Sequence, residues 1–286
     1  MQRTLRLLPL WLVLIFVPIA GMVQSAPTRE GFVAFSAMPA GSLIPNIYVV
    51  LASGTGRERL LIPNASWPAV STDGSILAFV RGQNIYLANY DGSGIRAITN
   101  HAATVQVAHP AFNAVGNVVI FAMGSPTTPF AVVAVNIDGS GETTITPNGL
   151  DPTFTPDGTQ IVFALANTID ILPVNHLGDN LQPSAIVTQV PSVFLRYPVF
   201  SPRTQFSAYT FAPSLTAVPS IRLISFANGQ RNDSKWEVNA TQPAFSPDGK
   251  RIAFTRDGDI YVKSVVGGAP IRLTSGRVNS EPVWMK

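Results

Sequence analysis

The sequence predicts an all-β protein, a six-bladed β-propeller that is closed by strands from both termini and follows an N-terminal signal peptide. Three observations lead to this prediction. A proline-led phrase recurs about every 40–45 residues, which is the repeat length of four-stranded propeller blades. Short β-rich runs separated by turn residues fill each repeat, and an apolar segment stands near the start of the chain.

Residues 1–25 have the composition of a secretory signal peptide. Two arginines precede a wholly apolar stretch, residues 7–20, and small or modest side chains surround Ser25, where a signal peptidase would cut. An uncleaved membrane anchor is the alternative, but this stretch is shorter than the roughly 20 residues of a spanning helix and holds two prolines. We expect cleavage near Ser25, a short linker at residues 26–30, and export to the periplasm or the cell exterior.

The charge balance argues against several classes of partner. The chain has 19 basic and 16 acidic residues, and loss of the two arginines in the signal peptide leaves 17 basic residues. No cluster of lysine or arginine remains, so nucleic-acid binding is not expected. The absence of cysteine excludes a disulfide framework and thiolate metal ligands. We expect a monomer whose only membrane contact is the signal peptide, if that segment stays uncleaved.

The recurring phrase is clearest at residues 243–249, which read Pro-Ala-Phe-Ser-Pro-Asp-Gly. Its copies begin at Pro68, Pro110, Pro152, Pro198, Pro243 and Pro282. In the Ser-Pro-Asp-Gly turn, proline fixes one φ angle, aspartate bonds nearby backbone amides, and glycine takes the positive φ that lets the chain reverse. Asp73, Asp157 and Asp248 are therefore expected to form turns, not to act in catalysis or metal binding.

Each copy continues with further strands, and four strands per repeat make a blade. The expected second strands are residues 76–80, 118–122, 161–164 and 252–255, the clearest third strands 84–87 and 259–262, and the fourth strands 96–99, 143–146 and 272–274. Strands at 31–36, 46–49 and 59–62 lack a first strand, which residues 281–286 would supply. The two ends should therefore complete a shared sixth blade within a propeller at residues 31–286, which removes open sheet edges.

This pattern of turn, apolar strand, Ile-Tyr and Leu-Thr resembles the WD40-like repeat of TolB-type propellers. The resemblance covers roughly residues 31–286 and is strongest at 243–274. It implies an exported bacterial protein that binds other proteins of the cell envelope. Two features differ from the family: the signal peptide runs almost directly into the first strand, with no preceding α/β domain, and two copies lack the Pro-Asp-Gly turn. Other turn chemistry is expected at residues 113–116 and 201–204.

The residue before each leading proline differs from copy to copy while its neighbours repeat. These six residues are Trp67, His109, Asp151, Tyr197, Gln242 and Glu281. Because equivalent positions of a propeller form a ring, we expect them to surround one mouth of the central channel. Aromatic, acidic and imidazole groups in one ring are suited to hold a peptide end, a sugar or a cation. The alternative is that they are polar residues lining a solvated channel mouth.

The same face of the propeller is expected to carry the longer loops. These are residues 36–46, 123–130 and 211–220 between second and third strands, and 100–108 and 189–196 between blades. Irregular loops on a rigid scaffold often carry recognition. Phe130, Phe194, Phe211 and Leu215 are candidates for an apolar patch that binds a protein partner, or for side chains that pack over the blade edges.

These features predict a scaffold for an envelope or extracellular protein partner, and not an enzyme. The sequence has no Gly-x-Ser-x-Gly elbow and no His-Glu-x-x-His motif, and no cofactor or metal is expected. One alternative is a small-ligand or glycan-binding propeller that uses Trp67, Tyr197 and the acidic ring residues. Another is a hydrolase or lyase that uses His109 with Asp151 or Glu281. A protein partner predicts a broad apolar surface, whereas a ligand or enzyme site predicts a deep funnel on which ring residues converge.

Overall fold

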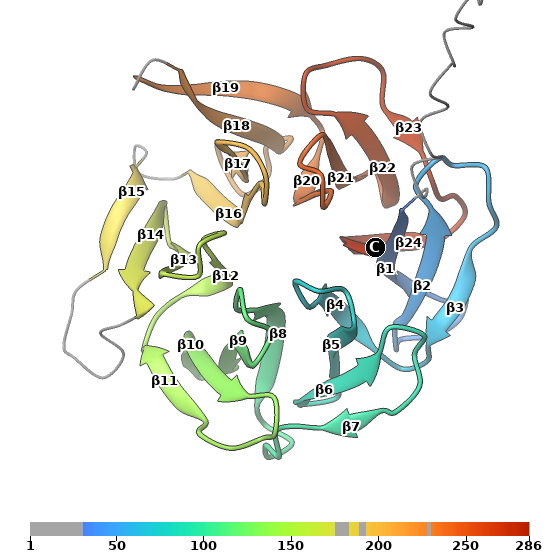
Figure 1. Cartoon of the computed structure of the whole chain (residues 1–286), viewed down its shortest axis with the longest axis vertical. Helices are drawn as coiled ribbons and strands as arrows, with labels where there is room; N and C mark the ends of the chain where they lie inside the picture. Colours follow the sequence, from blue (N-terminus) through green and yellow to red (C-terminus); the bar gives the residue numbers. More distant parts are fainter. Residues whose placement is uncertain (1–30, 175–182, 189–192, 228–229, 286) are drawn as a thin grey trace, which may run out of the picture.

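Alternating apolar strands and tight turns assemble into six four-stranded antiparallel sheets in a computed structural model of the chain. The sheets stand around a central axis like the blades of a propeller (Figure 1). The structure describes residues 31–174, 183–188, 193–227 and 230–285. The predicted all-β fold with six blades is confirmed. The predicted signal peptide and linker lie outside the described residues.

Five blades are built from four consecutive strands each, ordered from the axis outward. The first blade is β4 (Ser66–Val70), β5 (Ile76–Arg81), β6 (Asn84–Asn89) and β7 (Arg96–Ala97); the second is β8 (Gln106–Phe112), β9 (Val118–Ser125), β10 (Thr128–Asn136) and β11 (Thr143–Thr146). The third is β12 (Leu150–Phe154), β13 (Gln160–Leu165), β14 (Thr168–Pro173) and β15 (Ser184–Thr188). The fourth is β16 (Phe194–Phe200), β17 (Phe206–Ala212), β18 (Ser220–Ala227) and β19 (Gln230–Val238); the fifth is β20 (Thr241–Phe245), β21 (Arg251–Arg256), β22 (Asp259–Ser264) and β23 (Ile271–Arg272).

The sixth blade joins strands that are far apart in the sequence. It consists of β24 (Val278–Met285), β1 (Phe32–Met38), β2 (Asn46–Leu51) and β3 (Arg59–Ile62). Its innermost strand, β24, pairs antiparallel with β1, and Val33 lies opposite Trp284. Because β24 also contacts β4, the inner strands follow one another completely around the axis.

One aromatic position repeats through the core of all six blades. The second strand of each blade carries there a side chain that is at most 2% exposed. These residues are Phe35, Phe79, Phe121, Phe163, Tyr209 and Phe254. Burial of such a side chain stabilises the fold by about 1.5–3 kcal/mol. In the fourth blade the buried Tyr209 hydroxyl donates to Asp233 Oδ2 at 2.8 Å, so its polar group is satisfied.

The turns between first and second strands have the predicted chemistry. Asp73 Oδ1 accepts hydrogen bonds from the Ser71 hydroxyl at 2.6 Å and the Ser75 N–H at 3.0 Å, and Gly74 has a φ of 79°. The Ser71 hydrogen bond is the main cause that lowers the pKa of Asp73 to about 2. The same hydroxyl–carboxylate contact recurs at Asp157 and Asp248. All three aspartates therefore serve as turn formers.

Two corners without the Pro-Asp-Gly turn use different acceptors, as expected. In the second blade Asn113 Oδ1 accepts the N–H groups of Gly116 at 2.9 Å and Asn117 at 3.0 Å. In the fourth blade the Ser201 hydroxyl oxygen accepts the Thr204 N–H at 3.2 Å. An amide or a hydroxyl thus replaces the carboxylate without loss of the corner.

Gly249 is the turn glycine with the tightest inter-blade contact. Its φ is 70°, and a Cβ atom there would collide with the Ser201 hydroxyl of the neighbouring blade. We expect Gly249→Ala to lower the free energy of unfolding by about 1–2 kcal/mol in urea titrations. Gly82→Ala is the matched control, because Gly82 also has a positive φ but no atom within 4 Å of an added Cβ. Equal losses in both variants would mean that the contact with Ser201 contributes nothing.

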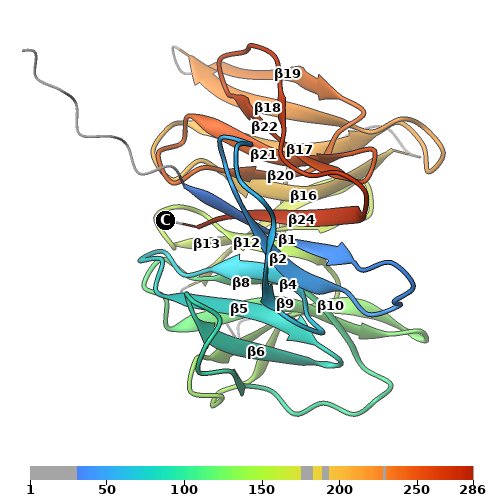
Figure 2. The same cartoon turned by 90° about the vertical axis from the view of Figure 1, so that its right-hand side faces the viewer.

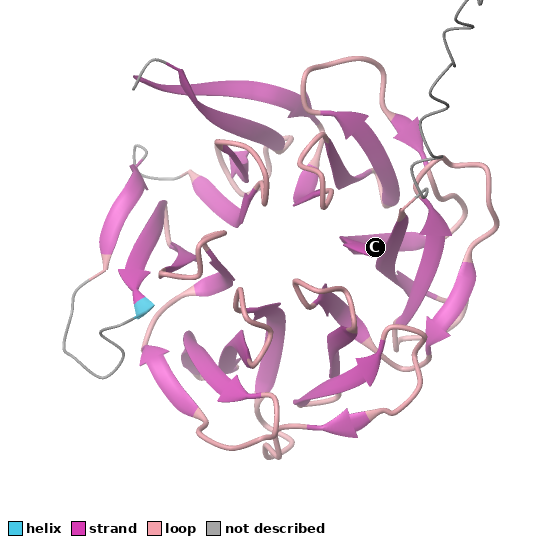
Figure 3. Cartoon of the chain, viewed as in Figure 1, coloured by secondary structure: helices cyan, strands magenta, loops and turns pink. Residues whose placement is uncertain are grey.

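The propeller has two distinct faces, seen edge-on in Figure 2. Turns between first and second strands form the turn face, and connections between second and third strands form the loop face (Figure 3). Phe32 pairs with Met285, so β1 begins and β24 ends at the turn face. Within the described residues, no helix has the length and hydropathy needed to cross a membrane.

Candidate functional site: the axial ring and cavity

The six predicted ring residues share one unusual backbone conformation. Their φ angles all lie between 53° and 59°, in the left-handed region, and the members are Trp67, His109, Asp151, Tyr197, Gln242 and Glu281. Few residues other than glycine adopt this region, and bulky side chains do so rarely. The cost is on the order of 1–3 kcal/mol per residue, and such strain concentrates at functional sites.

A β-bulge at each inner strand explains this shared conformation. Between Ser66 and Ala69 the inner strand advances three residues while its partner β5 advances two, from Val80 to Ala78. The corresponding register shift occurs in all six blades. The bulge holds the ring residue and the proline after it, which has no N–H group to contribute to the sheet. All six ring side chains consequently line the axial cavity.

Contacts link neighbouring ring residues on one side of the axis. Glu281 Oε2 accepts the Trp67 N–H at 2.8 Å. The Trp67 ring packs against the His109 imidazole, with 3.7 Å between ring centroids. His109 Nε2 lies 3.0 Å from Asp151 Oδ1.

The chain of contacts continues around the other side. Asp151 Oδ2 accepts the Tyr197 N–H at 3.0 Å, and the Gln242 side chain is near enough to the Tyr197 hydroxyl to oppose the rise of its pKa. Gln242 Oε1 accepts the Glu281 N–H at 3.0 Å, which completes the circuit. On either side of Asp151, the Tyr197 and His109 ring centroids are 5.4 Å apart. The six residues are thus brought together in one connected network.

Asp151 is a fully paired carboxylate. It is 3% exposed, and Arg196 donates to both of its oxygens, with Nη2 2.9 Å from Oδ1. Burial acts to raise its pKa, but the charges and hydrogen bonds of His109 and Arg196 outweigh burial and hold the pKa well below the ordinary value. Asp151 therefore stays ionised, with its charge balanced inside the ring.

Glu281 is the opposite case. Its Oε2 atom accepts hydrogen bonds from the Ser36 hydroxyl at 2.5 Å and the Trp67 N–H at 2.8 Å, both neutral donors. Burial raises the pKa of Glu281 from an ordinary 4.5 to about 7, against the effect of those hydrogen bonds. Because no cation among the described residues forms an ion pair with it, this carboxyl group changes protonation near neutral pH.

Hydroxyl groups on second strands support the ring, a role that was not predicted from the sequence. Ser36 and Thr210 accept the N–H groups of Trp67 at 3.0 Å and Gln242 at 3.1 Å. Thr255 donates to Gln242 Oε1 at 2.9 Å. Each of these hydroxyl residues directly follows the repeated core aromatic, where the first three blades carry valine or alanine. This polar replacement in an apolar repeat was the signal available in the sequence.

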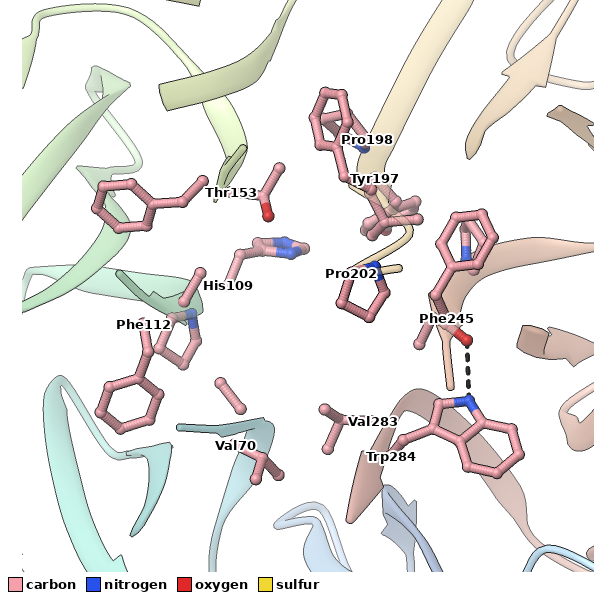
Figure 4. A pocket seen from close by; sticks show the side chains of 18 of the residues that line it. Val70, His109, Phe112, Thr153, Tyr197, Pro198, Pro202, Phe245, Val283 and Trp284 are labelled. Carbon is pink, nitrogen blue, oxygen red and sulfur yellow. Dashed lines mark hydrogen bonds between the residues drawn. The ribbon is translucent and has the colours of Figure 1, made fainter. Parts of the chain in front are cut away.

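The ring forms one end of a cavity of about 540 Å³. The leading prolines and the two residues after each line its walls, and exposed Thr72 and Pro156 border it at the turn face. Figure 4 shows His109, Thr153 and Val283 around this space. The cavity is therefore a funnel with mostly apolar walls that opens at the turn face and ends on a polar, aromatic floor.

The longer loops lie on the other side of the ring, at the loop face. Leu43 is 95% exposed between β1 and β2, and Leu215 is 82% exposed between β17 and β18. Phe130, Phe194 and Phe211 are only half-buried members of β10, β16 and β17, so the four candidate patch residues are divided between two blades. The expectation of a long loop at 123–130 is wrong, because β9 and β10 continue to a tight hairpin there.

Comparisons with known proteins agree with this architecture. A family model described as the dipeptidyl peptidase IV N-terminal region matches residues 218–283. No curated protein sequence matches the chain. Among solved structures, TolB from Acinetobacter baumannii is 17% identical with a TM-score of 0.71, over 89% of this chain and 66% of that protein. The fold is that of a TolB-type propeller.

Two further structures show how widely this propeller occurs. A protein described as TolB from Agrobacterium tumefaciens is 19% identical, with a TM-score of 0.60 over 83% of this chain and 91% of that one. An oligogalacturonate lyase from Vibrio parahaemolyticus is 12% identical, with a TM-score of 0.55 over 80% and 71%. At such identities the likeness concerns the fold alone, and one fold can carry different functions.

The chemistry available to this propeller follows from its floor groups. In the described part of the chain, no group of three or more histidine, cysteine, aspartate or glutamate side chains is arranged to hold a metal ion. The floor instead offers aromatic faces, an imidazole and one carboxyl group with a raised pKa. These groups are suited to bind an amphipathic ligand that enters from the turn face.

Proposed function

We propose that the protein is an exported binding propeller that holds a segment of an envelope or extracellular protein partner in its axial cavity. The main observation in support is the 540 Å³ funnel, on whose floor all six ring residues converge. Its apolar walls suit the side chains of an entering polypeptide segment, and its polar floor fixes the end or side chain that reaches deepest. In this proposal the ring residues bind and do not catalyse.

Export and domain organisation are part of the same proposal. Residues 1–25 act as a signal peptide, residues 26–30 as a linker, and residues 31–286 as a monomeric propeller in the periplasm or outside the cell. Residues 1–25 supply the compositional argument, and the TolB-type fold is compatible with an envelope location. The pairing of β24 with β1 supports closure of the ring by strands from both ends of the chain.

A small-ligand or glycan-binding propeller is the second candidate. The observation in its favour is the convergence of all six ring residues on one cavity, because a broad apolar surface was the expectation for a protein partner. A funnel-shaped site is also compatible with a protein partner, because a single polypeptide segment of that partner can fill the funnel. A lyase or hydrolase is the third reading, supported by the raised pKa of Glu281 near the His109 side of the ring.

The test is to fill the cavity and compare capture of the partner. Thr153 lines the cavity and is half-buried, so Thr153→Trp places a bulky side chain inside it. Leu43→Trp adds the same bulk at the loop face and is the matched control. The tagged proteins are crosslinked in cells that export them, and captured envelope proteins are compared after affinity purification.

We expect wild type and Leu43→Trp to capture the same discrete protein and Thr153→Trp to lose at least nine-tenths of it, roughly a tenfold change. Loss in Leu43→Trp alone would move binding to the loop face and contradict a cavity site. If wild type captures no specific protein, the scaffold proposal fails, and glycans and small ligands become the candidates for the cavity.

A further inference from the structure

The two carboxyl groups on the cavity floor have very different partners. Asp151 faces Arg196 and His109, so its negative charge is matched within the ring. Glu281 accepts hydrogen bonds from neutral donors only, and no lysine, arginine or histidine among the described residues forms an ion pair with it. The floor therefore holds one largely enclosed acidic group that has no counter-ion among the described residues.

Such a group stabilises a cation that can replace water around it. An uncompensated buried carboxylate is costly, and the rise in the pKa of Glu281 to about 7 reflects that cost. A positive charge placed beside the carboxyl group would recover the lost interaction energy and favour the ionised form. The gain is large because both charges would lie in a partly desolvated cavity.

The surroundings favour an organic ammonium group over a metal ion. A calcium ion needs six or more oxygen ligands, whereas the floor near Glu281 presents a single carboxyl group, which accepts the backbone N–H of Trp67 and lines the same cavity as the Trp67 side chain. Aromatic faces attract ammonium and guanidinium groups. The ring already shows this contact, since the Arg196 guanidinium lies 4.9 Å from the Tyr197 ring centroid. The Arg196 guanidinium pairs with Asp151, so the part of the cavity floor around Glu281 has no cation among the described residues.

We propose that the cavity floor binds a primary ammonium group of the partner segment, with Glu281 as its counter-ion and the Trp67 indole as its aromatic neighbour. This inference rests on the proposed function and specifies the chemistry of the segment. An amino terminus and a lysine side chain both carry the required group. The rest of the segment lies against the apolar walls of the funnel.

Binding of an ammonium group is then linked to ionisation of Glu281. Its neighbours are Ser36 on β1, Trp67 on β4 and Gln242 on β20, none of which is charged. Tyr197 on β16 also faces it, and burial raises the pKa of that phenol to about 12, so it stays neutral. Farther around the ring, the Asp151 carboxylate of β12 contacts His109 of β8 and Arg196 of β16. The affinity for an ammonium group should therefore fall as the pH drops below 7 and Glu281 becomes protonated.

Three small probes test this inference on the mature protein. Nα-acetyl-lysine amide carries a side-chain ammonium, alanyl-proline amide carries a terminal one, and Nα,Nε-diacetyl-lysine amide is the neutral analogue. Binding is followed by intrinsic tryptophan fluorescence and by NMR shifts at pH 7.5 and 5.5. We expect at least one ammonium probe to bind at least tenfold more tightly than the neutral analogue, and roughly twentyfold more weakly at pH 5.5 than at pH 7.5. The probe that binds identifies the source of the group.

Two variants complete the test. Glu281→Gln should weaken ammonium binding at least tenfold and remove its pH dependence, whereas Glu58→Gln, which alters an ion pair with Arg277 outside the cavity lining, should leave it unchanged. Equal binding of neutral and ammonium probes, or full binding by Glu281→Gln, would overturn the inference. If Glu281→Gln also captures the protein partner as well as wild type does, the proposed function stands and only the ammonium site is rejected.

Discussion

Replacement of Asp151 by alanine is expected to lower the free energy of unfolding by about 3–5 kcal/mol at pH 7, the cost of leaving a buried ion pair without one partner. The Asp151 carboxylate receives two hydrogen bonds from Arg196, one from the Tyr197 N–H, and the contact with His109. Its removal leaves the Arg196 charge and the Tyr197 N–H without their acceptor. Urea unfolding of the purified propeller measures the loss.

A double variant shows whether the stranded charge causes this loss. Asp151→Ala/Arg196→Met removes both partners, so it should recover a large part of the stability lost in Asp151→Ala. The wild-type contribution of Asp151 also depends on pH. Because the folded state lowers its pKa, this stability is present above the ordinary value of 3.8 and is lost as the pH falls through the folded value. A double variant as unstable as Asp151→Ala would contradict the role of the uncompensated charge.

Glu281→Gln is expected to have the opposite effect, a gain of about 3 kcal/mol at pH 8. The folded state raises the pKa of Glu281 from 4.5 to about 7, so it favours the protonated form. The stability associated with that proton is present below pH 4.5 and is lost as the pH rises through 7. Glutamine is uncharged like the protonated acid, so the variant avoids the cost of ionising a buried carboxyl group.

The pH profile is the internal control for this prediction. Wild type and Glu281→Gln should have nearly equal unfolding free energies at pH 4, and their curves should separate between pH 5 and 8. A constant difference across the range would mean that packing or hydrogen-bond geometry, not ionisation, distinguishes the variants. No gain at pH 8 would show that the carboxyl group is ionised there without cost.

The blades could be predicted because each repeat contains the turn residues and β-rich runs of one blade. These features recur with the same spacing, so a copy with an unclear pattern can be interpreted from the others. The position before each proline is equivalent in all copies, which placed all six ring residues together. Local pattern is less informative about strand length: β9 and β10 extend through residues 123–125 and 128–130, where a loop was expected.

The ionisation and backbone conformation of the ring residues could not be predicted from the same pattern. The difference between Asp151 and Glu281 depends on which side chains from other blades reach them, and Arg196 pairs with only one of the two. The left-handed conformation also had no separate sequence signal. A residue before proline favours extended backbone, and only the bulge in the folded sheet imposes a φ near 54° on Trp67.

The sixth blade sets an order of assembly for the propeller. Blades one to five can form from contiguous stretches of chain, but β1 must wait for β24, whose Met285 lies opposite Phe32. Closing the loop of chain between β1 and β24 costs about 5 kcal/mol in chain entropy. The pairing is therefore favourable only when the other blades already hold the two strands near each other. Before β24 pairs with β1, the folded blades form an open arc with two exposed flanks.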